Sequence, residues 1–260
     1  MLALIDGDII AYRCAASCEP SKKKAAELGI DFEDLEREPL DIAIRRADEL
    51  IYRILNTTQA EQYRVYLTGS ENFRKLLYPD YKANRDKLPK PKWLDACREF
   101  LVREWKSEIC AGYEADDGIG IAAKDNFVIC SIDKDFRQIP GVHYNFVKDT
   151  FEEITESDAA FNFYSHLLIG DISDNVGGIV GIGPVKAGRL LSGKDPEEME
   201  SIVCGYYDDR DRYLLVRRLL RILRSEEEYN EIKAAIGQGK REEPSKDSRT
   251  EDPRDIPSFI

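Results

Sequence analysis

Short apolar runs and amphipathic stretches alternate along the N-terminal part of the chain. Residues 2–5, 63–67 and 127–132 are compact hydrophobic runs of the length expected for buried strands. Residues 41–56 repeat apolar side chains at helical spacing, and a second such pattern runs over residues 93–105. Strands that alternate with helices predict an α/β fold with a parallel central sheet flanked by helices.

The pattern becomes helical from about residue 158, where a glycine-rich segment separates two helical stretches. The end of the chain is dense in charges of both signs and contains three prolines, a composition typical of disorder. We therefore expect an α/β domain over residues 1–157, a helical region over 158–239 and a disordered tail over 240–260.

The bulk composition is that of an ordinary globular protein, with 42% hydrophobic and 34% charged residues among 260. No apolar run approaches the roughly 20 residues that span a membrane, and the start MLALIDGDIIAY lacks the basic leader of a signal peptide. Six cysteines without a CxxC pair and only two histidines argue against an ordinary zinc site. Scattered cysteines are typical of a reducing compartment, so we expect a cytoplasmic protein with no membrane partner.

The net charge of −12 and the pI of about 4.9 argue, on their own, against a nucleic-acid partner. Two segments depart from that average. Residues 74–92 contain seven basic and two acidic side chains, and residues 210–224 contain six arginines and one aspartate, a local net charge of +5 in each. The second segment fits a solvated amphipathic helix at least as well as a DNA contact.

Acidic residues gather in four clusters. Two clusters directly follow the first and third apolar runs, where the C-terminal ends of parallel strands meet at one edge of a sheet. The other two lie in the sequences GYEADDGIGIAA and GDISDN. The candidate ligands in these clusters are Asp6, Glu114, Asp116, Asp117, Asp133, Asp135, Asp171 and Asp174.

Carboxylates at this density would repel one another and hold protons unless cations lay between them. Hard oxygen ligands select Mg²⁺ or Mn²⁺, and two such ions about 4 Å apart can activate water and stabilise the leaving oxygen of a phosphodiester. Each cluster alone is better explained as a turn or a helix cap. The four clusters together predict a two-metal site.

The segment GIVGIGPVKA has the form of a helix–hairpin–helix. Glycines such as Gly178, Gly181 and Gly183 let backbone N–H groups approach a phosphate, and the following helix presents its N-terminus to the same anion. Lys186 and Arg189 can add positive charge, so this segment is expected to hold duplex backbone without reading sequence. The alternative is a plain helix–turn–helix packing element.

Basic and aromatic side chains interleave in the segment FRKLLYPDYKANRDKLPKPKW. Its lysines, among them Lys75, Lys87 and Lys90, would hold phosphates while its rings stack on bases, as in single-strand binding. Taken alone, the segment is better explained as an ordinary basic loop.

The motifs IDGD, YKANR, EADD, SIDKDF and GDISDNVGGIVGIG occur in the order seen in bacteriophage 5′–3′ exonucleases. Over residues 1–225 the chain resembles this family, which includes flap endonucleases and the 5′ nuclease domain of bacterial DNA polymerase I. The resemblance implies a PIN-like fold and a 5′ nuclease that acts on DNA with a 5′ end, overhang or flap, in phage replication or recombination. It also implies two Mg²⁺ or Mn²⁺ ions and a potassium ion at the glycine hairpin.

The resemblance assigns roles to individual residues. Lys82 and Arg85 match basic residues that contact the scissile phosphate, and Tyr81 matches a ring that stacks on the terminal base. Residues 74–92 match an arch over the active site, here a short one. The eight acids named above match the metal ligands.

One departure concerns those ligands. Asp171 and Asp174 match the second-metal pair, but the family also places an acid at the end of the second strand, where this chain reads YLTGSENF. That ligand is either missing or replaced by Thr68, Ser70 or Glu71.

Two other functions remain open. In a HAD-type phosphatase Asp6 would be the nucleophile and GDISD the last motif, but EADD, DKD and the glycine hairpin would have no role. A DNA-binding homologue without catalysis would explain the missing acid. The terminal RDIPSFI resembles the tips of single-strand-binding proteins and could dock replication proteins, although a passive tail is favoured.

Overall fold

The structure, a computed structural model, describes residues 1–29, 31–85 and 88–239. Its centre is a six-stranded sheet with the strand order β3-β2-β1-β4-β5-β6. All neighbouring strands are parallel except β5 and β6, which confirms the predicted α/β fold with a mostly parallel sheet. The strands are β1 (Leu2–Asp6), β2 (Gln62–Asn72), β3 (Glu108–Gly112), β4 (Phe127–Cys130), β5 (Gly141–Asn145) and β6 (Thr150–Ile154).

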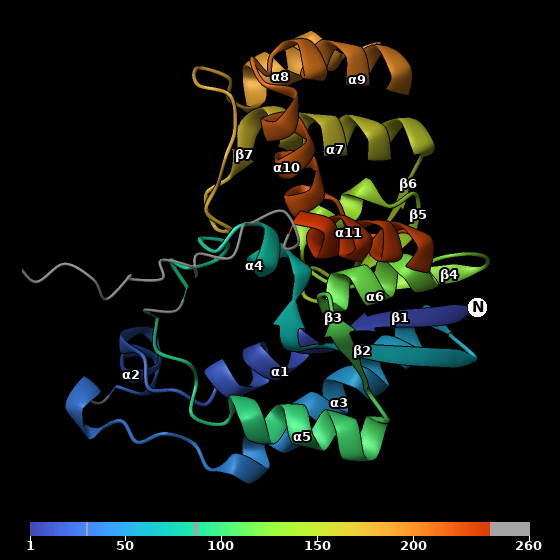
Figure 1. Ribbon diagram of the computed structural model, residues 1–260. Coiled ribbons are helices and arrows are strands. Elements are labelled where there is room, and N and C mark those ends of the chain that lie inside the picture. Colours follow the sequence, from blue (N-terminus) through green and yellow to red (C-terminus); the bar gives the residue numbers. More distant parts are fainter. Residues whose placement is uncertain (30, 86–87, 240–260) are drawn as a thin grey trace, which may run out of the picture.

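Helices cover both faces of this sheet (Figure 1). One face packs against α1 (Gly7–Ala16), α3 (Leu40–Thr58) and α5 (Leu94–Trp105), and the other against α6 (Ala115–Ala122). The alternation of side chains along β1 explains the two layers, because Ala3 and Ile5 belong to the first core and Leu4 to the second. Each fully buried aliphatic side chain contributes about 1.5–3 kcal/mol.

The register of the central strands brings the acidic motifs to one edge. Ile5 of β1 pairs with Cys130 of β4, and Asp6 pairs with Tyr66 of β2. Residues that follow these strands therefore leave the sheet at the same end. After β4 the chain enters the short helix η2 (Lys134–Gln138), which is capped by Asp133.

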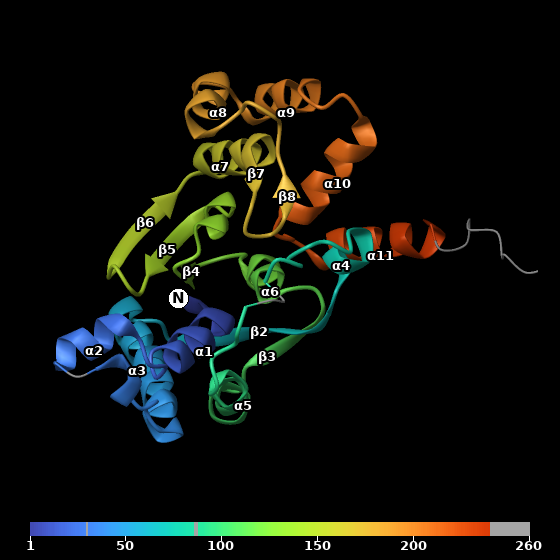
Figure 2. The same ribbon diagram turned by 90° about the vertical axis from the view of Figure 1, so that its left-hand side faces the viewer.

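The helical region stands on the α6 side of the sheet (Figure 2). Its first helix begins at Glu156, and Thr155 and Asp158 form a capping box at this end. Its own core contains Leu167, Leu191 and Val203. The elements are α7 (Glu156–Ile169), β7 (Gly170–Asp171), β8 (Val176–Gly177), α8 (Pro184–Leu191), α9 (Pro196–Gly205), α10 (Arg210–Leu220) and α11 (Glu226–Gly239).

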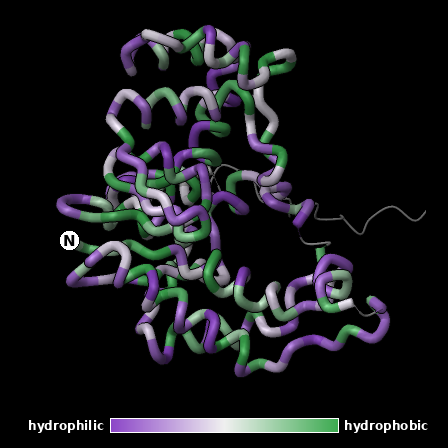
Figure 3. Tube along the Cα trace, turned by 180° about the vertical axis from the view of Figure 1, so that it is seen from behind, coloured by the Kyte–Doolittle hydropathy of each residue, from purple (hydrophilic) through white to green (hydrophobic). Residues whose placement is uncertain are grey.

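Two connecting segments contain short helices. The surface excursion after α1 forms α2 (Lys22–Leu28) and η1 (Phe32–Asp34), and its positions are mostly hydrophilic (Figure 3). The basic segment after β2 forms α4 (Phe73–Leu77) and then a series of turns beside the helical region. Within the described ranges, no helix is long and apolar enough to cross a bilayer.

Candidate active site and nucleic-acid interface

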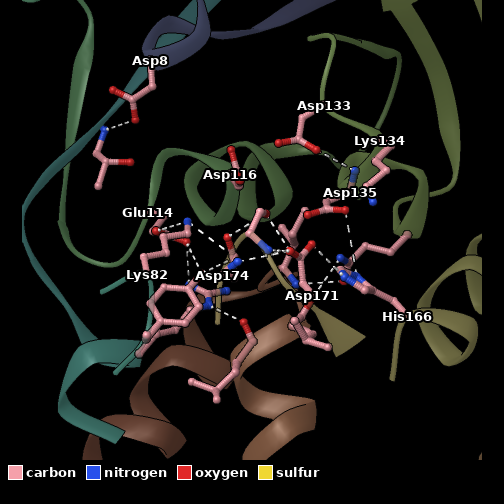
Figure 4. Close-up of a pocket in the computed structure, with 18 of the residues that line it drawn as sticks. Asp8, Lys82, Glu114, Asp116, Asp133, Lys134, Asp135, His166, Asp171 and Asp174 are labelled. Carbon is pink, nitrogen blue, oxygen red and sulfur yellow. Dashed lines mark hydrogen bonds and ion pairs between the residues drawn. The ribbon is translucent and has the colours of Figure 1, made fainter. Parts of the chain in front are cut away.

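A cavity of about 190 Å³ opens where the C-terminal ends of β1 and β4 meet α6 and the β7–β8 hairpin (Figure 4). Seven of the eight predicted metal ligands line it, together with further charged or titratable side chains from distant parts of the sequence. The predicted acids in its wall are Asp6, Glu114, Asp116, Asp133, Asp135, Asp171 and Asp174, and they are joined by Asp8, Lys82, Arg85 and His166.

Asp6 is held in place from both sides of its carboxylate. It caps α1 by accepting a hydrogen bond from the Ile9 N–H at 3.0 Å, and its other oxygen accepts from the Ser131 hydroxyl at 2.7 Å. The same hydroxyl accepts from the Asp133 N–H at 3.1 Å. These bonds couple the ends of β1 and β4, so the two acids face one pocket with fixed orientations.

Burial and mutual repulsion favour protonation of several of these acids. Burial, with Asp8 and Asp133 adding repulsion, raises the pKa of Asp6 from 3.8 to about 7. Burial also raises the pKa of Asp116 well above its ordinary value, as do Asp6 and Glu114. The pKa of Asp135 rises to about 6 through burial and the charge of Asp133. The negative charge of these carboxylates exceeds the positive charge of the basic side chains around them. Such a cluster of oxygen donors suits divalent cations.

Asp117 does not line the pocket with the other predicted metal ligands. It is fully buried outside the pocket, where its two oxygens bind the Arg74 guanidinium at 2.5 and 2.8 Å. It also accepts from the Glu114 N–H and from the Leu223 N–H, each at 3.0 Å. Asp117 therefore joins α6 to the chain that follows α10, and the pair formed with Glu114 is a capping box.

Arg74 likewise does not belong to the basic surface with which the sequence groups it. Only 3% of its side chain is exposed, and it also donates to the carbonyls of Leu219 at 2.9 Å and Arg221 at 2.7 Å. Its buried hydrogen bonds connect α4 to the end of α10.

The Tyr81 ring is also buried, at 1% exposure, and packs in the core of the helical region. The ring is therefore not exposed in this structure for the stacking on a terminal base that the resemblance implies, and that role stays a prediction. Its hydroxyl lies 3.0 Å from Glu114 Oε2 and 2.9 Å from Asp174 Oδ2, within hydrogen-bond distance of both. Tyr81 thus bridges two acids that are 60 residues apart in the chain.

Lys82 and Arg85 extend this bridge toward the pocket. Lys82 Nζ lies 2.6 Å from Glu114 Oε1, and Arg85 binds Asp174 Oδ1 at 2.5 Å. Burial alone would raise the pKa of Glu114, but the charges of Arg74 and Lys82 outweigh it and the pKa is lowered. Arg85 is half exposed at the rim, whereas Lys82 is 80% buried behind it.

The two aspartates of GDISDN face different neighbours, although the resemblance treats them as a pair. Asp174 faces Glu114 and Lys82, while Asp171 turns toward His166 and Asp135 (Figure 4). His166 is missing from the residues expected from sequence. Its position in the last turn of α7, just before the hairpin, is the only local sign of its role.

Beside Thr68 of β2, near the position where the resemblance implies an acid, Asp8 of α1 lies in contact with the strand. The Thr68 N–H donates to Asp8 Oδ2 at 2.9 Å, and Arg98 binds both Asp8 and the Thr68 carbonyl. The Thr68 hydroxyl accepts from the Ala115 N–H at 2.9 Å. Ser70 and Glu71, the other candidates, are exposed and do not line the pocket.

The predicted DNA-binding residues that the structure describes differ in exposure. Lys75 and Lys90 are exposed, and Lys87 lies outside the described residues. Gly178 is needed for packing, because a Cβ there would lie 2.2 Å from the Ile169 carbonyl carbon. Gly181, with φ of +79°, turns the chain toward α8.

The start of α8 is open. Gly183 is its N-cap, and a Cβ at Gly183 would meet nothing within 4 Å. Lys186 and Arg189 are exposed on this helix. The arrangement of α7, the β7–β8 hairpin and α8 is therefore compatible with an anion at the N-terminus of α8.

Comparison with known proteins gives sequence relatives over most of the chain. Flap endonuclease Xni of Shewanella sp. (strain ANA-3) is 32% identical over 173 residues, which are 58% of this chain and 65% of the relative. A 5′-3′ exonuclease of Mycoplasma pneumoniae is 32% identical over 217 residues, 72% of this chain and 70% of the relative. This chain thus spans about two thirds of the length of these relatives.

Solved structures show the same fold. A flap endonuclease of bacteriophage T5, crystallised with DNA and metal ions, matches with a TM-score of 0.62 and 16% identity, covering 92% of this chain and 94% of the other. A second T5 5′-exonuclease structure, with bound zinc, gives a TM-score of 0.61 at 15% identity, covering 91% of this chain and 98% of the other. The family model for the 5′-3′ exonuclease N-terminal resolvase-like domain matches residues 1–163. This chain belongs to the 5′–3′ exonuclease family.

Proposed function

We propose that the protein is a metal-dependent 5′ nuclease that hydrolyses DNA phosphodiesters near a 5′ end. The observation that carries the proposal is the convergence of carboxylates from four separate segments in one pocket, with Lys82 and Arg85 beside them. The names of the relatives, flap endonuclease and 5′-3′ exonuclease, and the T5 neighbour solved with DNA and metal ions support the choice of substrate. A role in phage replication or recombination is part of this proposal.

The carboxylates fit two divalent cations, for which we propose Mg²⁺ or Mn²⁺. Asp116 and Asp133 lie on the side of the pocket formed by the sheet and α6, and Asp135 and Asp171 lie on the side of α7. Asp6 is joined to Asp133 through the Ser131 hydroxyl. Two bound cations would activate a water molecule and stabilise the leaving oxygen.

The basic residues respond to the substrate. Without DNA, Lys82 and Arg85 bind Glu114 and Asp174. A scissile phosphate in the pocket would compete for these cations, which then offset the charge that develops on its oxygens. Tyr81 would keep Glu114 and Asp174 oriented while the two basic side chains turn to the phosphate.

Duplex DNA beside the cut would be held by the helical region. The open N-terminus of α8, with Gly183, Lys186 and Arg189, offers backbone N–H groups and positive charge to a phosphate. A potassium ion at the glycine segment belongs to this proposal. The proposed contact with replication proteins falls on residues 240–260, outside the described residues.

The test uses a 5′-overhang duplex labelled at each end and incubated with Mg²⁺, Mn²⁺ or EDTA. Shortening from the 5′ end that requires metal supports the proposal, and tight binding without cleavage would favour the inert homologue. Hydrolysis of p-nitrophenyl phosphate without DNA cleavage would favour the HAD-type phosphatase. In that alternative Glu114, Asp116 and Asp135, which line the same pocket as Asp6, would have no role.

A further inference from the structure

His166 faces two carboxylates that come from different elements. Its Nε2 lies 3.3 Å from Asp171 Oδ2, and its Nδ1 lies 4.0 Å from Asp135 Oδ1. One ring nitrogen and one oxygen from each carboxylate lie within 4.8 Å of one another. Figure 4 shows the three side chains converging on one side of the pocket, from η2, α7 and β7.

We propose that Asp135, His166 and Asp171 form the second cation site, with His166 as a direct ligand, and that this site takes a first-row transition metal ion in preference to Mg²⁺. The inference deepens the proposed function, on which it rests for the assignment of the pocket to cations. It adds a nitrogen ligand and a different metal to one half of that pocket.

The spacing suits a single ion. An octahedral ion with bonds of about 2.1 Å holds neighbouring ligands about 3 Å apart and opposite ligands about 4.2 Å apart. The observed limit of 4.8 Å is slightly wider, so small side-chain rotations bring the three atoms onto one ion. His166 and Asp135 also border a second hollow, which leaves room for water molecules to complete the coordination.

Asp171 is oriented for ligation through one oxygen. Its Oδ1 accepts from the Ser173 N–H and hydroxyl, both at 2.6 Å, and from the Asp174 N–H at 3.1 Å. Its Oδ2 is left to face His166. Outer hydrogen bonds of this kind fix the direction of a metal-binding carboxylate. Asp174 is not one of these three groups, and its carboxylate is bound instead by Tyr81 and Arg85.

The donor set decides the metal. Imidazole is a ligand for transition metal ions, whereas Mg²⁺ prefers oxygen donors only. The group formed by Asp6, Asp116 and Asp133 offers oxygen only, so the two halves of the pocket differ in chemistry. One face would therefore hold Mg²⁺ while the other holds a transition metal ion.

The experiment measures Mn²⁺ bound to the full chain in the absence of DNA. Pulsed electron paramagnetic resonance detects the coupling of Mn²⁺ to the nitrogen of a coordinated imidazole. The chain has two histidines, so His143→Ala is the matched control. His143 lies on β5, where its Nε2 is 2.8 Å from the Ile139 carbonyl oxygen. His166→Gln keeps an amide of similar reach if His166→Ala fails to fold.

We expect nitrogen coupling in the wild type and in His143→Ala, and its loss in His166→Ala and His166→Gln. The two His166 variants should bind Mn²⁺ at this site at least about tenfold more weakly. At the same Mn²⁺ concentration they should therefore hold one ion fewer than the wild type. An excess of Mg²⁺ should displace the uncoupled Mn²⁺ first. Absence of nitrogen coupling in the wild type, or its persistence in both His166 variants, would overturn the proposal.

These results are independent of nuclease activity. Nitrogen coupling in a protein that cuts no DNA would support this metal site and contradict the proposed function. Cleavage of DNA by a protein without nitrogen coupling would support the proposed function and contradict this metal site.

Discussion

Arg74 and Asp117 form a buried pair in which two parallel hydrogen bonds, at 2.5 and 2.8 Å, join α4 to α6. Both side chains are at most 3% exposed. The same guanidinium donates to the carbonyls of Leu219 and Arg221, so one arginine connects three segments. The pair therefore stabilises the packing of the segments around the pocket and does not bind its cations.

Breaking this pair should therefore lower stability. Replacing one partner leaves an unpaired buried charge, and we expect Asp117→Ala to lower the free energy of unfolding by about 3–5 kcal/mol. Urea denaturation measures the change. The exposed pair of Arg64 and Glu108, at 3.9 Å, is the control, and Glu108→Ala should cost about 0–1 kcal/mol. Equal effects of the two substitutions would contradict the assignment.

Lys82 should matter for the chemical step. We expect Lys82→Ala to lower kcat by about a hundredfold, because a charge that offsets the developing negative charge of the transition state is removed. Single-turnover cleavage with saturating DNA measures this effect separately from binding. Lys148→Ala removes an exposed lysine on the β5–β6 connection and should leave kcat unchanged. A rise in KM alone after Lys82→Ala would show that the residue only binds DNA.

Asp8 should supply the carboxylate that β2 lacks. Its contacts with the Thr68 N–H and with Arg98 place it beside Thr68, within that strand. We expect Asp8→Asn to weaken Mg²⁺ binding by at least about tenfold, as measured by calorimetry, because one charged ligand is lost from the group around Asp6. Glu71→Gln, at an exposed acid of the same strand, is the control. Unchanged Mg²⁺ affinity in Asp8→Asn would sink this prediction.

The stability of the metal-free protein should fall as the pH rises from about 5 to 7.5. The pKa of Asp6 is raised from 3.8 to about 7 and that of Asp135 to about 6, so the folded state binds more protons than the unfolded chain in this window. Stability that depends on these protons is lost as they dissociate. His143, whose pKa is lowered, acts in the opposite direction.

Thermal unfolding in EDTA across this range measures the slope. Asp6→Asn should flatten it, since the amide does not titrate. Mg²⁺ at about a hundred times its Kd should restore about 2.7 kcal/mol at pH 7.5. A metal-free protein that gains stability over the same range would contradict the account of the acidic cluster.

The strands that the sequence predicted are those with continuous apolar runs, β1, β2 and β4. These lie in the middle of the sheet, where both faces are covered. The strands β3, β5 and β6 are not expected from the sequence, because they lie at or next to the sheet edges, are partly exposed and carry mixed side chains. In β3 only Cys110 is buried.

The site was predictable where acids follow strands or share a helix turn, as at Asp6, Asp133 and Glu114. Sequence spacing failed where a long-range partner decides the role. Asp117 meets Arg74 from 43 residues away, and the Tyr81 ring is buried by helices that come much later in the chain. His166 reaches Asp135 only because α7 folds back over η2, which no local spacing encodes.

The most direct test of the central claim compares cleavage of the 5′-overhang duplex by Asp133→Ala and Asp125→Ala in Mg²⁺. Asp133 follows the C-terminal end of β4 and lines the pocket, whereas Asp125 is exposed at the opposite end of the same strand. We predict that Asp133→Ala abolishes shortening from the 5′ end while it still binds the duplex, and that Asp125→Ala cuts like the wild type. Undiminished cleavage by Asp133→Ala would contradict a metal-dependent nuclease site in this pocket.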